Sequence, residues 1–151
     1  MDKKMFCFQC EQTVGCAGCT GNAGVCGKKA DTARLQDELT GALIGLARAV
    51  DSTTAISKRT GQVIIEGLFT TVTNVNFDDA SIENMIQKVR AEKERLVPDC
   101  SKGQSPCGKT GEYDMQQLWN ANEDIRSLKS LILFGIRGMA AYAYHANVLN
   151  Y

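Results

Sequence analysis

The sequence has no net charge, a single histidine and no long apolar run. Seventeen basic and seventeen acidic side chains are mixed along its 151 residues. Balanced charge provides no field that attracts nucleic acid or an anionic membrane. The longest apolar run, 131–136, is far below the roughly twenty residues that cross a bilayer. We therefore expect neither nucleic acid nor a membrane as a partner.

The N-terminus lacks the apolar stretch of a signal peptide. Its first four residues carry suitable charge, but polar and cysteine residues follow where an apolar segment is needed. We therefore expect a cytoplasmic protein. A chain of this length buries roughly two-thirds of the surface that it exposes when unfolded, so it does not need crosslinks to fold.

Cysteines are abundant and unevenly placed. Two of the seven, Cys100 and Cys107, lie apart, and the others crowd into twenty residues: Cys7, Cys10, Cys16, Cys19 and Cys26. An odd count argues against a fully paired disulfide framework, and a reducing compartment keeps thiols free to bind metal. Glycines interleave with these cysteines and apolar periodicity is absent, so residues 1–30 are predicted to form a loop that wraps closely around a bound group.

Apolar residues at helical spacing predict three helices before residue 98. The first covers residues 31–49 with Asp31 as its N-cap. The second covers 62–75, where β-branched residues leave a strand as the alternative. The third begins after Asp78 or Asp79 and ends before Pro98.

A loop and a last helix are predicted for the remainder. Residues 99–112 contain Cys100 and Cys107 but no apolar periodicity, and we expect a loop there without a metal site. Asn122 is predicted to cap the last helix, in which Gly135 and Gly138 would let another helix approach. Its apolar side consists of Ile125, Leu128, Leu131, Ile132, Ile136, Met139 and Ala143.

These patterns predict an all-α fold. Residues 31–151 are expected to form an up-and-down bundle of three to four main helices, preceded by the cysteine-rich loop of residues 1–30, together as one compact domain.

Cys7 and Cys10 are separated by two residues, so a tight turn can present both thiolates to one metal atom or one cluster edge. Both zinc and the iron of sulfide clusters prefer thiolate ligands, so this pair alone does not distinguish the two metals. Two further ligands are expected from Cys16, Cys19 and Cys26, and the glycine N–H groups between them can donate hydrogen bonds to cluster sulfurs.

Four blocks of the sequence resemble, in order, the hybrid cluster protein family, also called hydroxylamine reductase or prismane protein. The first block consists of MFCFQCEQT at 5–13, GCT at 18–20 and GVCGK at 24–28. The others lie at 31–39, 67–79 and 122–145. The resemblance therefore covers nearly the whole chain.

The resemblance implies that Cys7, Cys10, Cys19 and Cys26 bind the N-terminal cluster of that family. This cluster is usually a 4Fe-4S cubane and in some members a 2Fe-2S cluster. The gaps of two, eight and six residues between these cysteines are closer to the cubane form. Cys16 is then an extra thiol, with the alternative that it replaces Cys19 as a ligand.

The implied function is an electron-transfer domain. It would relay electrons from an electron-donor reductase toward a hybrid iron-sulfur-oxygen cluster, whose ligands lie in later domains of the enzyme. We therefore expect no hydroxylamine reduction by this chain alone, and we assign no catalytic residue and no role to His145. The alternatives are a structural zinc-binding interaction module and a cluster-based redox sensor.

Overall fold

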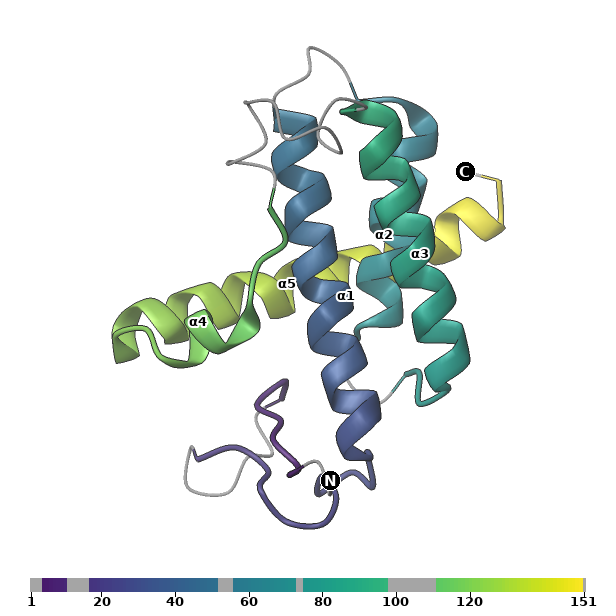
Figure 1. Cartoon of the computed structure of the whole chain (residues 1–151). Coiled ribbons are helices and arrows are strands. Elements are labelled where there is room, and N and C mark those ends of the chain that lie inside the picture. The colour runs from purple at the N-terminus through teal and green to yellow at the C-terminus, as the bar shows by residue number, and fades with distance from the viewer. Residues whose placement is uncertain (1–3, 11–16, 52–55, 73–74, 98–110, 151) are drawn as a thin grey trace.

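A computed structural model describes residues 4–10, 17–51, 56–72, 75–97 and 111–150 (Figure 1). These residues contain no strand and form five helices, which confirms the all-α prediction. The helices are α1 (Ala30–Asp51), α2 (Lys58–Thr70), α3 (Asp79–Leu96), α4 (Met115–Trp119) and α5 (Glu123–Val148). None of these helices is long and apolar enough to cross a membrane.

Helices α1, α2 and α3 lie side by side and alternate in direction (Figure 1). They bury the apolar residues that recur at helical spacing, because these residues share one face of each helix. Gly67 of α2 packs closely against α1: a Cβ atom there would lie 2.7 Å from Leu43 Cδ2, so the leucine side chain would have to shift to admit it. The core consists of Leu35, Leu39, Ala42, Leu43, Leu46, Val63, Ile82, Met85, Ile86 and Val89.

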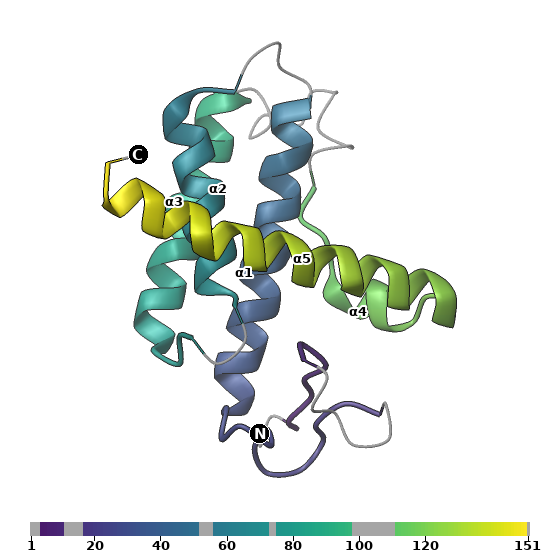
Figure 2. The same ribbon diagram turned by 180° about the vertical axis from the view of Figure 1, so that it is seen from behind.

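Helix α5 crosses these three helices at a steep angle and contacts α2 (Figures 1 and 2). The up-and-down arrangement therefore applies to α1–α3, and α5 lies across them. Much of the apolar side predicted for α5 faces solvent: Leu131 is 68% exposed and Met139 is 74% exposed. Within the described residues, nothing lies within 4 Å of a Cβ atom built on Gly135 or Gly138, so no helix approaches there.

Several helix boundaries differ from the predictions. Asp31 is not an N-cap, because α1 begins at Ala30; the carboxylate lies in the first turn, where the helix dipole still favours it. Helix α2 begins earlier than predicted, after Ser57, whose side chain accepts a hydrogen bond from Thr60 N. It ends at Thr70, and the strand alternative for this segment is wrong.

The predicted caps of the later helices are confirmed. Asp78 caps α3 and Asn122 caps α5, each accepting a hydrogen bond from the backbone N–H two residues on. Helix α4, capped by Asp114, was not predicted, because five residues are too few to show a period. Pro98, Cys100 and Cys107 lie outside the described residues.

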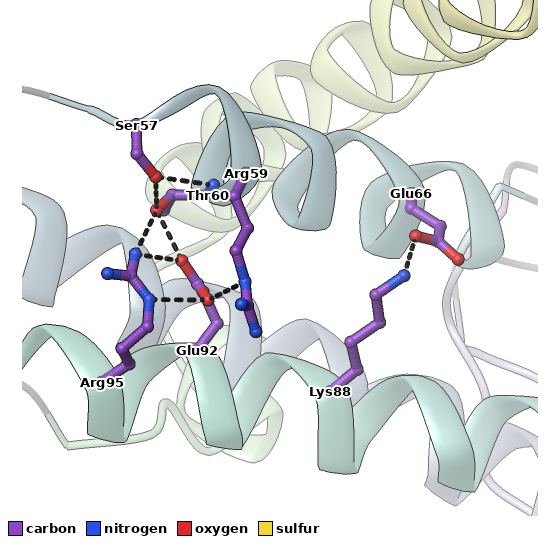
Figure 3. Close-up of polar contacts among 7 residues, drawn as sticks. All are labelled: Ser57, Arg59, Thr60, Glu66, Lys88, Glu92 and Arg95. Carbon is purple, nitrogen blue, oxygen red and sulfur yellow. Dashed lines mark hydrogen bonds and ion pairs between the residues drawn. The ribbon is translucent and has the colours of Figure 1, made fainter.

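A buried carboxylate connects α2 to α3 (Figure 3). Glu92 is 1% exposed and accepts hydrogen bonds from Arg95 Nη2 and Thr60 Oγ1, each at 2.6 Å. Arg59 Nε lies 3.0 Å from its other oxygen. The hydrogen bonds from Arg95, with the one from Thr60 and the charges of Arg95 and Arg59, lower the pKa of Glu92 to about 2 against the opposing effect of burial. Nearby, the exposed Lys88 forms an ion pair with Glu66.

Candidate metal centre

The segment that carries Cys7 is extended, and its side chains alternate between two environments. Met5, Cys7 and Gln9 are buried, as expected when alternate residues of an extended chain share one face. Phe6 and Phe8 point the other way and contact Trp119 of α4, with ring centroids 5.1 and 4.9 Å away. This aromatic contact holds the segment against the helical body. The alternation is visible in the sequence, but the absence of helical periodicity there led only to the prediction of a loop.

The structure pairs two of the predicted ligands, Cys7 and Cys19. Cys7 N donates to Cys19 O at 3.1 Å, and Cys19 N donates to Cys7 O at 2.7 Å. Directly opposite residues of an antiparallel pair place their side chains on the same face. Gly18 makes this approach possible: its φ is +80°, and a Cβ atom there would lie 3.2 Å from Cys7 O.

The remaining cysteines lie in more accessible positions. Cys10 and Cys19 are half-buried and Cys26 is exposed, and all four described cysteines are free thiols. Cys26 precedes Gly27, whose φ of +85° belongs to a turn closed by a hydrogen bond from Gly27 N to Gly24 O at 2.8 Å. Cys16 lies outside the described residues.

The four thiols do not form a closed cage. Among the described residues, no three Cys, His, Asp or Glu side chains lie close enough together to hold a metal ion. The structure thus brings Cys7 and Cys19 together, and within the described residues it does not group them with Cys10 or Cys26.

A buried lysine lies beside Cys7, and sequence reasoning assigned it no role. Lys28 is 2% exposed, and its Nζ lies 3.9 Å from Cys7 Sγ. The same Nζ donates to Gln9 Oε1 at 2.8 Å and to Gln36 Oε1 at 2.5 Å. The one signal in the sequence was its position two residues after Cys26 in the GVCGK block.

Two further charged groups affect the electrostatics at Cys7. Burial raises the pKa of Asp37 to about 6, opposed by the hydrogen bond from Gln9 and the charges of Arg137 and Lys28. Burial lowers the pKa of Arg137 to about 10, opposed by Asp37 and Cys7. Burial also raises the pKa of the Cys7 thiol, against the lowering effects of a backbone hydrogen bond at Gln9 and the charge of Lys28.

The residues present are chemically suited to a thiolate-bound metal cluster. Thiolates are the donors that iron in sulfide clusters prefer, and four free thiols lie on the described part of the loop. A buried cation directed at one of them compensates the negative charge that such a centre carries. Gly18 and Gly27 let the backbone turn closely beside Cys19 and Cys26, since both adopt positive φ angles that other residues rarely take.

Comparison with known sequences agrees with this chemistry. Residues 5–151 match the Prismane/CO dehydrogenase family. The chain belongs to this family. A hydroxylamine reductase of Methanococcus vannielii is 39% identical over 97% of this chain, and one of Porphyromonas gingivalis is 39% identical over 100% of it. Family membership implies iron-sulfur cluster binding. No solved structure matches this chain.

The matches cover only part of the relatives. The chain spans 30% of the Methanococcus vannielii protein and 31% of the Porphyromonas gingivalis protein. A hydroxylamine reductase of Desulfovibrio desulfuricans is 38% identical over 99% of this chain, which is 30% of its own length.

Proposed function

We propose that this chain is an iron-sulfur electron-transfer domain of the hybrid cluster protein type. Cys7, Cys10, Cys19 and Cys26 would hold the cluster, a 4Fe-4S cubane in preference to a 2Fe-2S cluster. When bound, such a cluster accepts and releases one electron at a time. The observation that carries the proposal is the Cys7–Cys19 backbone pair beside the buried ammonium of Lys28.

The residues of the chain would orient the ligands and limit the access of water. Cys7 is 6% exposed and packs with Met5 and Ala33, so one thiolate would be shielded from water. The contacts of Phe6 and Phe8 with Trp119 hold the ligand-bearing segment on the helical body. Solvent exposure and hydrogen bonding at the sulfurs are the main means by which a protein sets a cluster potential.

We further propose two partners in a reducing, cytoplasmic setting. An electron-donor reductase would deliver electrons to the cluster at the exposed side of the loop, where Cys26 lies. The hybrid-cluster domains of the enzyme would receive these electrons, and hydroxylamine reduction would require those domains.

The exposed apolar side of α5, with Leu131 and Met139, supports docking of a further polypeptide, because soluble proteins rarely expose large contiguous apolar patches.

Anaerobic reconstitution of the chain with ferrous iron and sulfide tests the cluster assignment. We expect a brown protein with about four iron and four sulfide per chain; about two of each would indicate the smaller cluster. A Cys7→Ser variant should fail to retain the cluster. A colourless chain that binds one zinc ion would instead support the structural zinc module and would overturn the proposal.

A further inference from the structure

The Nζ of Lys28 has three acceptors around it. They are Gln9 Oε1 at 2.8 Å, Gln36 Oε1 at 2.5 Å and Cys7 Sγ at 3.9 Å. An ammonium group has three N–H donors, whereas a neutral amine has only two. The contacts therefore describe a charged lysine that directs one of its three donors at the sulfur of Cys7.

Both glutamine amides are oriented by their other contacts. Gln9 Nε2 donates to Ala33 O at 3.1 Å and to Asp37 Oδ1 at 2.7 Å. Gln36 Nε2 donates to Asn76 O at 2.8 Å. Because each amide NH₂ group donates its hydrogen bonds to carbonyl or carboxylate oxygens, the amide oxygen Oε1 of each glutamine faces Lys28. The cation is thus held at a defined place beside Cys7.

The charge of Lys28 has no direct anionic partner in the described part of the chain. A buried cation costs several kcal/mol unless an anion compensates it. Among the described residues no ion pair joins Lys28 to a carboxylate; Asp37 shares Gln9 with Lys28 and otherwise attracts it only through space. Arg137 adds a second buried positive charge that interacts with Asp37 and Cys7. Lys28 and Arg137 therefore both favour a negative charge at the sulfur of Cys7, against the opposing effects of burial and of Asp37.

We propose that Lys28 compensates the negative charge of the cluster. Its positive charge, placed beside the sulfur of Cys7, would raise the reduction potential of the cluster. This inference rests on the proposed function. Reduction by an external one-electron donor adds one electron, and hence one negative charge, to the thiolate-bound centre. A fixed positive charge stabilises the more negative, reduced state more than the oxidised one. No proton transfer is involved, and the Cys7 thiolate remains bound throughout.

Substitution of Lys28 by glutamine tests this effect. Lys28→Gln removes the charge, and Lys29→Gln removes the same charge from an exposed neighbour. Both are reconstituted anaerobically beside the unsubstituted chain and titrated with dithionite, and the reduced cluster is followed by electron paramagnetic resonance. We expect Lys28→Gln to lower the equilibrium constant for reduction at least tenfold, which is about 59 mV for a one-electron couple. Lys29→Gln should leave the potential unchanged.

A second variant keeps the lysine and adds a negative charge beside it. Gln36→Glu places a carboxylate on the side chain that accepts from Nζ at 2.5 Å, and it too should lower the reduction potential. If circular dichroism shows that Lys28→Gln does not fold, Gln36→Glu alone tests the effect of Lys28 on the potential. Potentials of Lys28→Gln and Gln36→Glu equal to that of the unsubstituted chain would overturn the role of Lys28 while the cluster assignment stands. An unsubstituted chain that binds no iron would overturn both.

Discussion

Arg137 on α5 donates from Nη2 to Thr40 Oγ1 on α1 at 2.9 Å, across 97 residues of sequence. Its Nε donates to Thr71 Oγ1, directly after α2, at 3.0 Å. Each threonine hydroxyl in turn donates to a carbonyl of its own helix, Thr40 to Gln36 O and Thr71 to Leu68 O. One guanidinium therefore joins three helices at their crossing, and both hydroxyls are used as donor and acceptor.

Replacing Arg137 by alanine should lower the free energy of unfolding by about 2–4 kcal/mol, because it removes two hydrogen bonds to a charged group and leaves a cavity. Urea denaturation measures the change. Lys129→Ala, on an exposed position of the same helix, is the control and should change stability little. Equal effects of the two substitutions would contradict the anchoring role of Arg137.

Gly41 of α1 lies against the backbone of the segment that leads into α4. Tyr113 N donates to Gly41 O at 3.1 Å, and a Cβ atom on Gly41 would lie 2.2 Å from Tyr113 O. We expect Gly41→Ala to destabilise the protein by about 1–3 kcal/mol, since backbone must move to admit the methyl group. Gly61→Ala in α2 meets nothing within 4 Å and should be neutral or stabilising by up to about 1 kcal/mol. Thermal unfolding of the two variants provides the comparison.

Glu92 should contribute stability that depends on pH. Its pKa is about 2 in the folded protein and 4.5 as its ordinary value, so the contribution is complete above pH 4.5 and is lost as the pH falls toward 2. At pH 7 we expect Glu92→Gln to cost about 1–3 kcal/mol in urea denaturation. The difference from the unsubstituted chain should shrink below pH 4.5.

Glu66→Gln is the matched control, because the pair of Glu66 with Lys88 is solvent-exposed and should be worth less than about 1 kcal/mol. A constant difference between Glu92→Gln and the unsubstituted chain from pH 7 to 3 would show that the carboxylate charge does not matter.

The four proposed ligands can be separated from the fifth cysteine of the loop. We expect Cys26→Ser to abolish the visible absorbance of the reconstituted chain, because a hydroxyl group is a poor replacement for a thiolate ligand of iron. Cys16→Ser should leave the absorbance and the iron content unchanged. Bleaching by the Cys16 substitution would show that the ligand set is wrong.

The apolar side of α5 should matter for docking and not for folding of this chain. Leu131→Lys and Met139→Lys change residues that are 68% and 74% exposed, so stability should shift by no more than about 0.5 kcal/mol. Both should weaken binding to the hybrid-cluster domains of a relative, produced separately and measured by calorimetry. Binding unaffected by either charge would contradict docking on this face.

Local patterns were sufficient to predict most helices. The apolar residues of α1 and α3 recur at the helical period, and Asp78 and Asn122 are side chains that satisfy free N–H groups at helix starts. Both signals are contained within a few residues of sequence. The boundaries of α2 were displaced because its β-branched residues weaken the local signal, and packing against α3 and α5 overrides that weakness.

The sequence by itself determined the approximate positions of the four longer helices and the segment that carries the thiols, because both depend on neighbouring residues. Only the tertiary structure decided that Lys28 is buried beside Cys7, that Arg137 joins three helices, and that α5 crosses the bundle with its apolar side exposed. A lysine or arginine in a sequence is most often a surface residue. Its burial depends on acceptors supplied by segments far along the chain, and these meet it only when the helices pack.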